Sequence, residues 1–294
     1  MQSGKRKVRK GGVDVTKKPV IAIMYDFDKT LCTKNMQEYS FIQNMGLSEQ
    51  EFWDTTEKLA KNNQMDGILA YMWQMIVESK KNSKSIHRKD FVELGKNLKF
   101  YSGVKEWFAR INAFGKEQCV KVEHYIISSG LKEIIEGCDI YKEFQDVFAC
   151  EYLYDENDTA CWPKNVVNYT TKTQFLFRIN KGVTDLSDDK SLNDFVPEDE
   201  RRIPFRNMIY IADGITDVPC MKLVKVNGGN SIAVYQKGKK NQANQLIQDH
   251  RVNFVAAANY TEDSELDKIV KSIIKEVSLK DKLVRLHLKQ KASK

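Results

Sequence analysis

Two aspartates follow a nearly continuous apolar run, Pro19 to Tyr25, which is typical of a strand buried on both faces of a parallel sheet. These are Asp26 and Asp28, and their i, i+2 spacing on an extended chain predicts that both point to one face. They stand at the carboxyl end of the strand, where open α/β sheets bind ligands. Two close carboxylates favour a bound cation or a retained proton on one of them. The pair suits phosphoryl transfer, in which one Asp attacks phosphorus and the other moves a proton, although an Asp-rich helix cap would also fit this motif alone.

A second motif follows the strand predicted at 122–127. It consists of Ser128, Ser129 and Gly130, a hydroxyl-bearing pair and a small residue. We expect this turn to open a helix and to present backbone N–H groups to a phosphate.

A third motif adds two more carboxylates at the same edge of the sheet. The strand predicted at 207–212 is followed by Asp213 and Asp217. We expect these to converge with Asp26 and Asp28, and four carboxylates need a divalent ion. Hard oxygen ligands beside a phosphate favour Mg²⁺.

The candidate cation is Lys172, which begins an apolar helix. A positive charge is electrostatically unfavourable at a helix start, so this position favours a functional role over a surface one. Lys164 and Lys181 are alternatives, but neither opens an apolar helix.

The elements around these motifs alternate between strand and helix, which predicts an α/β fold with a Rossmann-like doubly wound parallel sheet. Further strands are expected at 231–235 and, more weakly, at 253–256. Helices are expected at 132–137, 171–180, 218–225, 242–249 and 265–277.

One long insertion interrupts this alternation. Residues 33–100 have helical periodicity throughout, with a capping-box signature from Ser48 to Glu51, and predict an inserted all-helical cap domain. The α/β core would then comprise residues 19–32 and 101–277. The polar, acidic segment 181–206 is expected to be a solvated surface excursion.

The charge is unevenly distributed along the 294 residues. Residues 1–18 carry seven Lys or Arg and one Asp, and residues 271–294 carry eight Lys or Arg and two acids. The rest of the chain is therefore mildly acidic within a total of +7. We expect a basic N-terminal tail at 1–18 and a basic C-terminal helix or tail at 278–294, both solvated, and no nucleic-acid partner.

Composition excludes several other classes of protein. The 14 Phe, 12 Tyr and 4 Trp are too many core formers for a disordered chain. The six Cys include no C-x-x-C pair, so a structural zinc site or a disulfide framework is not expected. No apolar run approaches the roughly 18 residues of a membrane span, and the basic residues before the first strand lack the apolar stretch of a secretory signal. We therefore expect a cytoplasmic protein without a membrane partner.

Taken together, the four motifs resemble those of the haloacid-dehalogenase-like phosphatases, most closely the phosphoserine-phosphatase-like members with a helical C1-type cap. The resemblance spans about residues 19–275 and keeps the family's motif order. It implies that Asp26 is the nucleophile, that Asp28 is the general acid/base and that Lys172 neutralises the pentavalent phosphorus.

The resemblance also implies the binding residues. The phosphate would be bound by Ser128 with the amides of Ser129 or Gly130, and Thr30 would hold the turn. Mg²⁺ would lie among Asp26, the backbone carbonyl of Asp28, Asp213 and Asp217, with Asp217 orienting the lysine or a metal-bound water.

These roles predict a Mg²⁺-dependent phosphatase acting on a small phosphorylated metabolite. Asp28 favours phosphate chemistry over dehalogenation, because an alkoxide leaving group needs a proton and a halide does not. The first acid after the motif is Glu38 and Arg88 is the one Arg of residues 33–100, a pattern that departs from phosphoserine phosphatases. The alternatives are a phosphotransferase or mutase of the same superfamily, or a polyanion-binding protein with a vestigial phosphatase fold.

Overall fold

The computed structural model describes residues 18–292, and within them seven strands form one sheet in the order β4-β3-β2-β1-β5-β6-β7. All neighbours pair in parallel except β4, which runs antiparallel to β3 at one edge. This confirms the predicted Rossmann-like α/β class. The strands are β1 (Val20–Tyr25), β2 (Lys121–Leu131), β3 (Asp146–Tyr154), β4 (Ala160–Asn165), β5 (Met208–Ala212), β6 (Asn230–Tyr235) and β7 (Phe254–Ala257).

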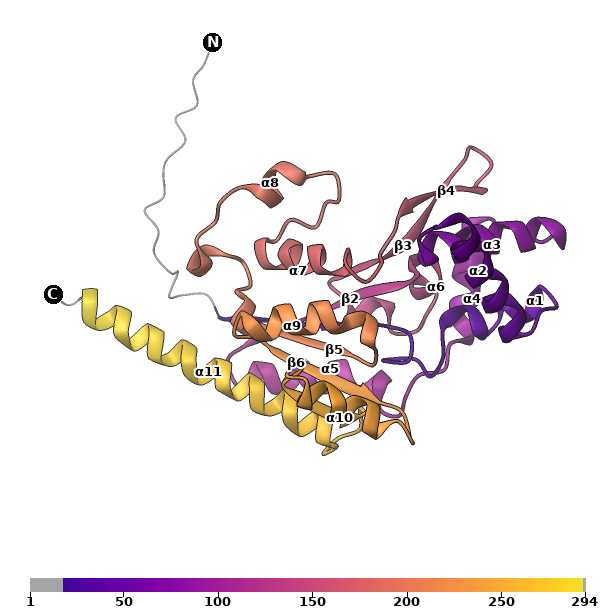
Figure 1. Cartoon of the computed structure of the whole chain (residues 1–294). Coiled ribbons are helices and arrows are strands. Elements are labelled where there is room, and N and C mark those ends of the chain that lie inside the picture. The colour runs from indigo at the N-terminus through magenta and orange to yellow at the C-terminus, as the bar shows by residue number, and fades with distance from the viewer. Residues whose placement is uncertain (1–17, 293–294) are drawn as a thin grey trace, which may run out of the picture.

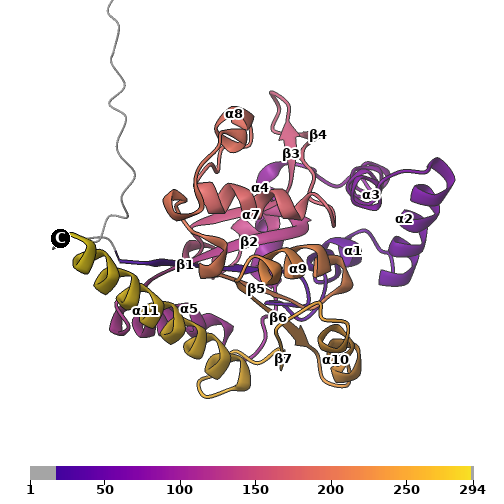
Figure 2. The same cartoon turned by 60° about the vertical axis from the view of Figure 1, so that its left-hand side comes forward.

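Helices cover both faces of the sheet, as Figures 1 and 2 show. The central strand β1 is apolar along its whole length because neither of its faces meets water. Helices α7 and α9 lie over one face, and α5 and α11 lie over the other, with α10 beside β6 and β7. The covering helices are α5 (Val104–Glu117), α7 (Lys172–Lys181), α9 (Val218–Val226), α10 (Lys240–Gln248) and α11 (Glu265–Ala292).

Four helices of the chain between β1 and β2 gather at one end of the molecule (Figure 1). They are α1 (Phe41–Asn44), α2 (Glu49–Asn63), α3 (Gly67–Lys81) and α4 (Arg88–Leu94). The capping box at Ser48 is present at the start of α2. The two connections to the sheet run side by side, since Cys32 and Phe100 form an antiparallel bridge. The second connection ends at Gly103, whose positive φ and contact with Tyr260 backbone leave no room for a Cβ atom.

Several helices and strands of the structure were not predicted from the sequence. The hairpin β3–β4 and helix α5 occupy stretches that the analysis left unassigned, and helix α11 continues through the segment expected to be a helix or tail. The acidic segment 181–206 contains the short helix α8 (Asp189–Asn193), and Asp185 and Leu186 carbonyls accept hydrogen bonds from buried Arg178.

No helix of residues 18–292 is long and apolar enough to cross a bilayer. The tail expected at 1–18 lies outside the described residues except for Lys18.

A buried histidine of β2, His124, makes the fold sensitive to acid. The Trp107 indole donates to the Tyr25 hydroxyl at 2.7 Å, and this hydroxyl lies 3.0 Å from His124 Nδ1. Tyr25 therefore donates to Nδ1, so Nε2 carries the proton toward Asn112 Oδ1 at 3.1 Å. Burial lowers the pKa of His124 from 6.5 to about 3, which keeps the ring neutral in the folded protein.

We expect His124 to lower the stability of the protein below about pH 6.5. Below this pH, His124 binds a proton in the unfolded chain but not in the folded protein. The free energy of unfolding therefore falls by about 1.4 kcal/mol for each pH unit. Urea unfolding of the wild type and of His124→Gln at pH 7.5 and pH 5 measures the effect. The variant should lose about 2 kcal/mol less than the wild type between these pH values. An equal loss in both proteins would show that folding does not change the pKa of His124.

Candidate active site

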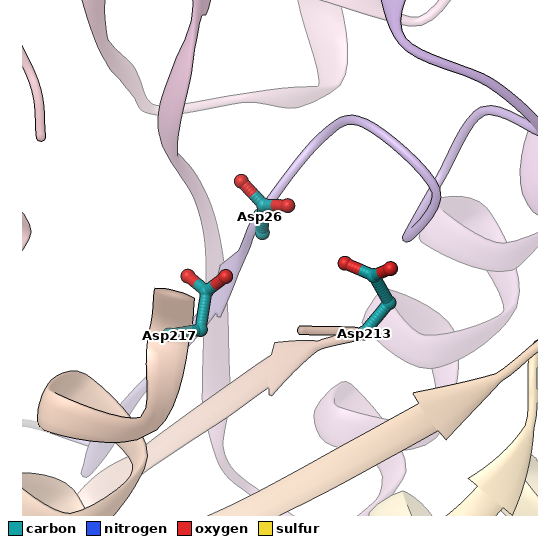
Figure 3. A group of neighbouring side chains, drawn as sticks. All are labelled: Asp26, Asp213 and Asp217. Atoms are coloured by element: carbon teal, nitrogen blue, oxygen red, sulfur yellow. The ribbon is translucent and has the colours of Figure 1, made fainter. Parts of the chain in front are cut away.

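The predicted carboxylates meet where the strand order reverses, at the carboxyl ends of β1 and β5. Tyr25 pairs with Ile211 in register, so Asp26 and Asp213 leave neighbouring strands at nearly the same level. Asp217 follows at the start of α9. Figure 3 shows the carboxyl groups of Asp26, Asp213 and Asp217 facing one small region, and one oxygen from each lies within 4.8 Å of the others. This is the switch point at which doubly wound sheets bind ligands.

Lys172 joins two of these carboxylates. It is the first residue of α7, and its Nζ donates to Asp26 Oδ1 at 2.8 Å and to Asp217 Oδ1 at 2.7 Å. The side chain is buried, which by itself would lower the pKa of Lys172, but Asp217 and Asp26 raise it overall. The competing lysines lie elsewhere, since Lys164 pairs with Glu151 and Lys181 donates to backbone carbonyls of residues 192 and 194.

Asp217 is held on both of its oxygens. The Tyr210 hydroxyl donates to Oδ1 at 2.6 Å, and the Thr216 hydroxyl donates to Oδ2 at 3.0 Å. Tyr210 lies in the middle of β5, where the sequence pattern indicates only a core aromatic residue. The fixed carboxylate in turn fixes the ammonium of Lys172, so this tyrosine positions the lysine indirectly.

The donor set fits a hard divalent cation. If Asp26, Asp213 and Asp217 are all ionised, their three negative charges and the one positive charge of Lys172 leave the site with a net charge of −2. Burial raises the pKa of Asp26 well above its ordinary value, and burial with the neighbouring charge of Asp217 raises the pKa of Asp213 to about 6. A cation that prefers oxygen ligands, such as Mg²⁺, would relieve both effects.

Asp28 does not join this group, which corrects the expectation that four carboxylates converge. Its Oδ1 accepts from the backbone N–H of Met36 at 2.9 Å and from the Cys32 thiol at 3.5 Å. The i, i+2 rule fails because β1 ends at Tyr25 and the chain then turns, with Lys29 at φ 57°. Burial raises the pKa of Asp28 to about 7, against the opposing hydrogen bond from Met36. A metal contact through its carbonyl stays a prediction.

The segment from Ser128 to Gly130 is not the helix-opening turn that the sequence predicts. Strand β2 continues to Leu131, and α6 (Lys132–Glu136) begins after it. The three residues form a bulge. Ile127 pairs with Phe148 and Leu131 pairs with Cys150, so three residues of β2 lie opposite a single residue of β3. Bulges next to active sites re-aim side chains, and this one holds the Gly130 N–H on Ser128 Oγ at 3.0 Å. The phosphate role of these residues stays a prediction.

Two hydroxyls near these segments are buried without a hydrogen-bond partner among residues 18–292. They belong to Ser129 and Thr30. The Thr30 hydroxyl therefore does not hold the turn as expected; its carbonyl does so by accepting from Tyr260 at 2.9 Å. A buried hydroxyl without a partner is costly, and a bound phosphoryl oxygen would satisfy such a group.

The helical insertion contacts this edge of the sheet through Met36 and Tyr71, two residues that the sequence analysis did not single out. Met36 contacts the bulge, since its Sδ accepts from the Leu131 N–H at 3.1 Å, and a Cβ on Gly130 would collide with its methyl group. Two residues later, buried Glu38 accepts from the Trp53 indole at 3.0 Å and from Asn35. Tyr71 of α3 donates to the Ser129 carbonyl at 2.7 Å. The insertion thus lies against the carboxyl edge, beside Asp28.

Solved structures share this overall fold. A HAD-family hydrolase from Salmonella enterica serovar Typhi superposes with a TM-score of 0.54 and 16% identity, over 88% of this chain and 72% of that one. A substrate-bound phosphoserine phosphatase matches with a TM-score of 0.54 and 15% identity, over 87% of this chain and 99% of the other. The chain therefore has the fold of the haloacid-dehalogenase-like hydrolases.

Sequence comparison adds a relative of higher identity. An uncharacterized protein of Borreliella burgdorferi is 30% identical over 274 residues, which cover 84% of this chain and 94% of the relative. The two proteins belong to one family. A probable phosphoserine phosphatase from Vibrio cholerae shares the fold at 12% identity and a TM-score of 0.52, over 91% of this chain and 69% of that one. No family model matches the sequence.

Proposed function

We propose that this protein is a Mg²⁺-dependent phosphomonoester hydrolase that acts through an aspartyl-phosphate on a small phosphorylated metabolite. One observation carries the proposal. Lys172, almost wholly buried, bridges Asp26 and Asp217 inside a group of three carboxylates at the switch point of the sheet. This combination of nucleophile, fixed cation and hard-metal donors suits phosphoryl transfer, which needs positioning and charge neutralisation above all.

In the first half of the reaction, a carboxylate oxygen of Asp26 attacks phosphorus and the bond from phosphorus to the leaving oxygen breaks. Asp28 gives its proton to that oxygen, so that an alcohol departs. Its pKa of about 7 leaves a protonated fraction available near neutral pH. Lys172, donating to Asp26 Oδ1, stabilises the charge that gathers on the phosphoryl oxygens.

In the second half, water attacks the phosphorus of the acyl phosphate. Asp28, now a carboxylate, takes a proton from that water, and the bond between phosphorus and Asp26 breaks. Phosphate leaves and Asp26 is restored. A Mg²⁺ ion held by Asp26, Asp213 and Asp217 would supply positive charge against the phosphoryl group. Ser128 and Ser129 would bind the phosphoryl oxygens.

We further propose that residues 33–100 act as a cap over residues 19–32 and 101–277. Support comes from the contacts of Met36 and Tyr71 with the bulge of β2. A cap in this place would exclude bulk water and admit only a small substrate.

A panel of small phosphomonoesters tests the function. We expect phosphate release in the presence of Mg²⁺ and a loss of activity in excess chelator that added Mg²⁺ restores. Free phosphate is the quantity to measure, because transfer to another acceptor would consume the ester without releasing it. Full activity in chelator would contradict the metal, and substrate loss without free phosphate would favour the phosphotransferase alternative.

Glu38 provides a sharper test of the cap. Its carboxylate is buried beside Asp28, so it should attract a cationic group on the substrate and repel an anionic one. We expect Glu38→Gln to change the ratio of kcat/KM between amine-bearing and neutral phosphomonoesters by about tenfold or more, since one polar contact is worth roughly 1–3 kcal/mol. Glu57→Gln, on an exposed part of α2, is the matched control. An unchanged ratio would remove Glu38 from the substrate site.

A further inference from the structure

Helix α11 carries an exposed leucine stripe that its contacts with the sheet do not explain. Leu279, Leu283 and Leu286 are each more than half exposed, and their spacing confines them to roughly 60° of the helix circumference. The buried residues of the same helix, Val270 and Ile274 among them, lie on the opposite side. The stripe is therefore a second apolar face, and it lies on turns that extend past the sheet (Figure 1).

Basic residues flank the leucine stripe on both sides. By the same helical spacing, Lys280 and His287 lie on one side of it and Lys282 lies on the other, all in the last part of α11. Acids are few there: Glu276 pairs with Lys280, and Asp281 pairs with Arg285 on the side of α11 nearer the protein. A leucine face flanked by basic side chains is typical of helices that lie in a membrane interface.

The surface next to this part of α11 is also basic. A cavity of about 580 Å³ at the amino ends of β1 and β2 is lined by Lys18, Lys116 and Lys121 along with apolar and amide side chains. A second cavity, of about 250 Å³, lies between Lys18 and the α11 residues Ser278, Asp281, Lys282 and Arg285. Lys18 is common to both cavities.

Lys18 is also where 17 further residues join the fold. That segment carries six Lys or Arg and one Asp. Lys18, to which this segment is attached, lies beside the basic turns of α11. We call this end, made of Lys18, Lys116, Lys121, the leucine stripe and its flanking residues, the basic end.

We propose that the basic end binds the surface of a bilayer rich in anionic lipid. The leucine stripe would enter the headgroup region, and the lysines together with residues 1–17 would attract the lipid charge. This revises the sequence-based expectation that the protein has no membrane partner. A nucleic acid would bind the basic residues but would not need the three exposed leucines. A second copy of the chain would bring positive charges against positive charges at both edges of the stripe.

Bound in this way, the protein would keep its active-site edge free. Asp26 follows the carboxyl end of β1, whereas Lys18 precedes its amino end, so the basic end lies at the opposite end of the sheet. A soluble substrate would still reach the site. The inference rests on surface residues alone and holds whether or not the protein hydrolyses phosphoesters.

Vesicle flotation of the full chain tests the proposal. We expect at least tenfold more protein on vesicles of phosphatidylcholine with about 30 mol% phosphatidylserine than on phosphatidylcholine alone, and less binding as salt is raised. Replacing Leu279, Leu283 and Leu286 together by Ser should weaken binding to anionic vesicles at least tenfold. Replacing Lys5, Arg6, Lys7, Arg9 and Lys10 by Gln should also weaken it.

A matched variant controls for loss of exposed apolar area. Trp73 of α3 and Leu153 and Trp162 of the β3–β4 hairpin are each half exposed or more. These elements lie at the other end of the molecule from the last turns of α11 (Figure 1), and the joint replacement of the three residues by Ser should leave vesicle binding unchanged. Circular dichroism melts establish that each variant is folded. Absence of binding to anionic vesicles overturns the proposal. Full binding by the leucine variant overturns it too, and points to a nucleic acid if the protein also retains a single-stranded RNA. Leucine-dependent dimers in ultracentrifugation without vesicle binding would assign the stripe to a second copy.

Discussion

Asp26→Asn should reduce phosphate release by roughly four orders of magnitude or more while the protein stays folded. The amide has the shape of the carboxyl group but cannot attack phosphorus, and Lys172 alone cannot replace a nucleophile. The fold should survive, because burial already disfavours the charge that the substitution removes. Steady-state phosphate release by a preparation that mass spectrometry finds free of deamidation measures the effect.

Two further variants separate a missing nucleophile from general damage. Asp249→Asn, an exposed residue at the end of α10, should keep full activity. Asp28→Asn should still accept a phosphoryl group from p-nitrophenyl phosphate, whose leaving group needs no proton, and should then lose it slowly. Acid-quenched protein should therefore carry phosphate in Asp28→Asn and none in Asp26→Asn. Near-normal turnover by Asp26→Asn would exclude the covalent mechanism.

Lys172→Met should lower kcat by at least a hundredfold, on the order of 10²–10³. The methionine side chain fills a similar space but supplies no positive charge to Asp26 and Asp217. Breaking a buried ion pair by removing one partner also costs about 3–5 kcal/mol, so the free energy of unfolding in chelator should fall by about that amount. Activity assays and urea unfolding measure the two effects.

Lys164→Met is the matched control, since Lys164 is half exposed and pairs with Glu151 on the β3–β4 hairpin. It should change neither kcat nor stability by a measurable amount. If Lys172→Met retained full activity with only a loss of stability, the lysine would be a structural counter-ion and another group would have to neutralise the phosphoryl charge.

Local elements follow from the sequence most directly where a single pattern decides them. The apolar run before Asp26, the capping box at Ser48 and the apolar helix that begins at Lys172 each follow from residues within a few positions, and each is present. Helix α5 was missed although its buried Trp107, Phe108 and Ile111 have helical spacing. The β3–β4 hairpin was missed because β4 is short and mostly exposed and contains a proline, Pro163, as an edge strand can.

The residue types of the site were determined by the sequence alone: acids after two strands, hydroxyls after a third, and a lysine at a helix start. Which of them meet was decided by tertiary structure. Lys172 and Asp26 are 146 residues apart, and only the parallel register of β1 and β5 with the packing of α7 joins them to Asp213 and Asp217. The turn after Tyr25 separated Asp28 from that group, and the bulge in β2 replaced the expected helix start at Ser128. Sequence periodicity predicts side-chain directions only within a regular strand or helix. Asp28 follows the end of a strand and Ser128 lies in a bulge, so the local turn and bulge determine where these side chains point.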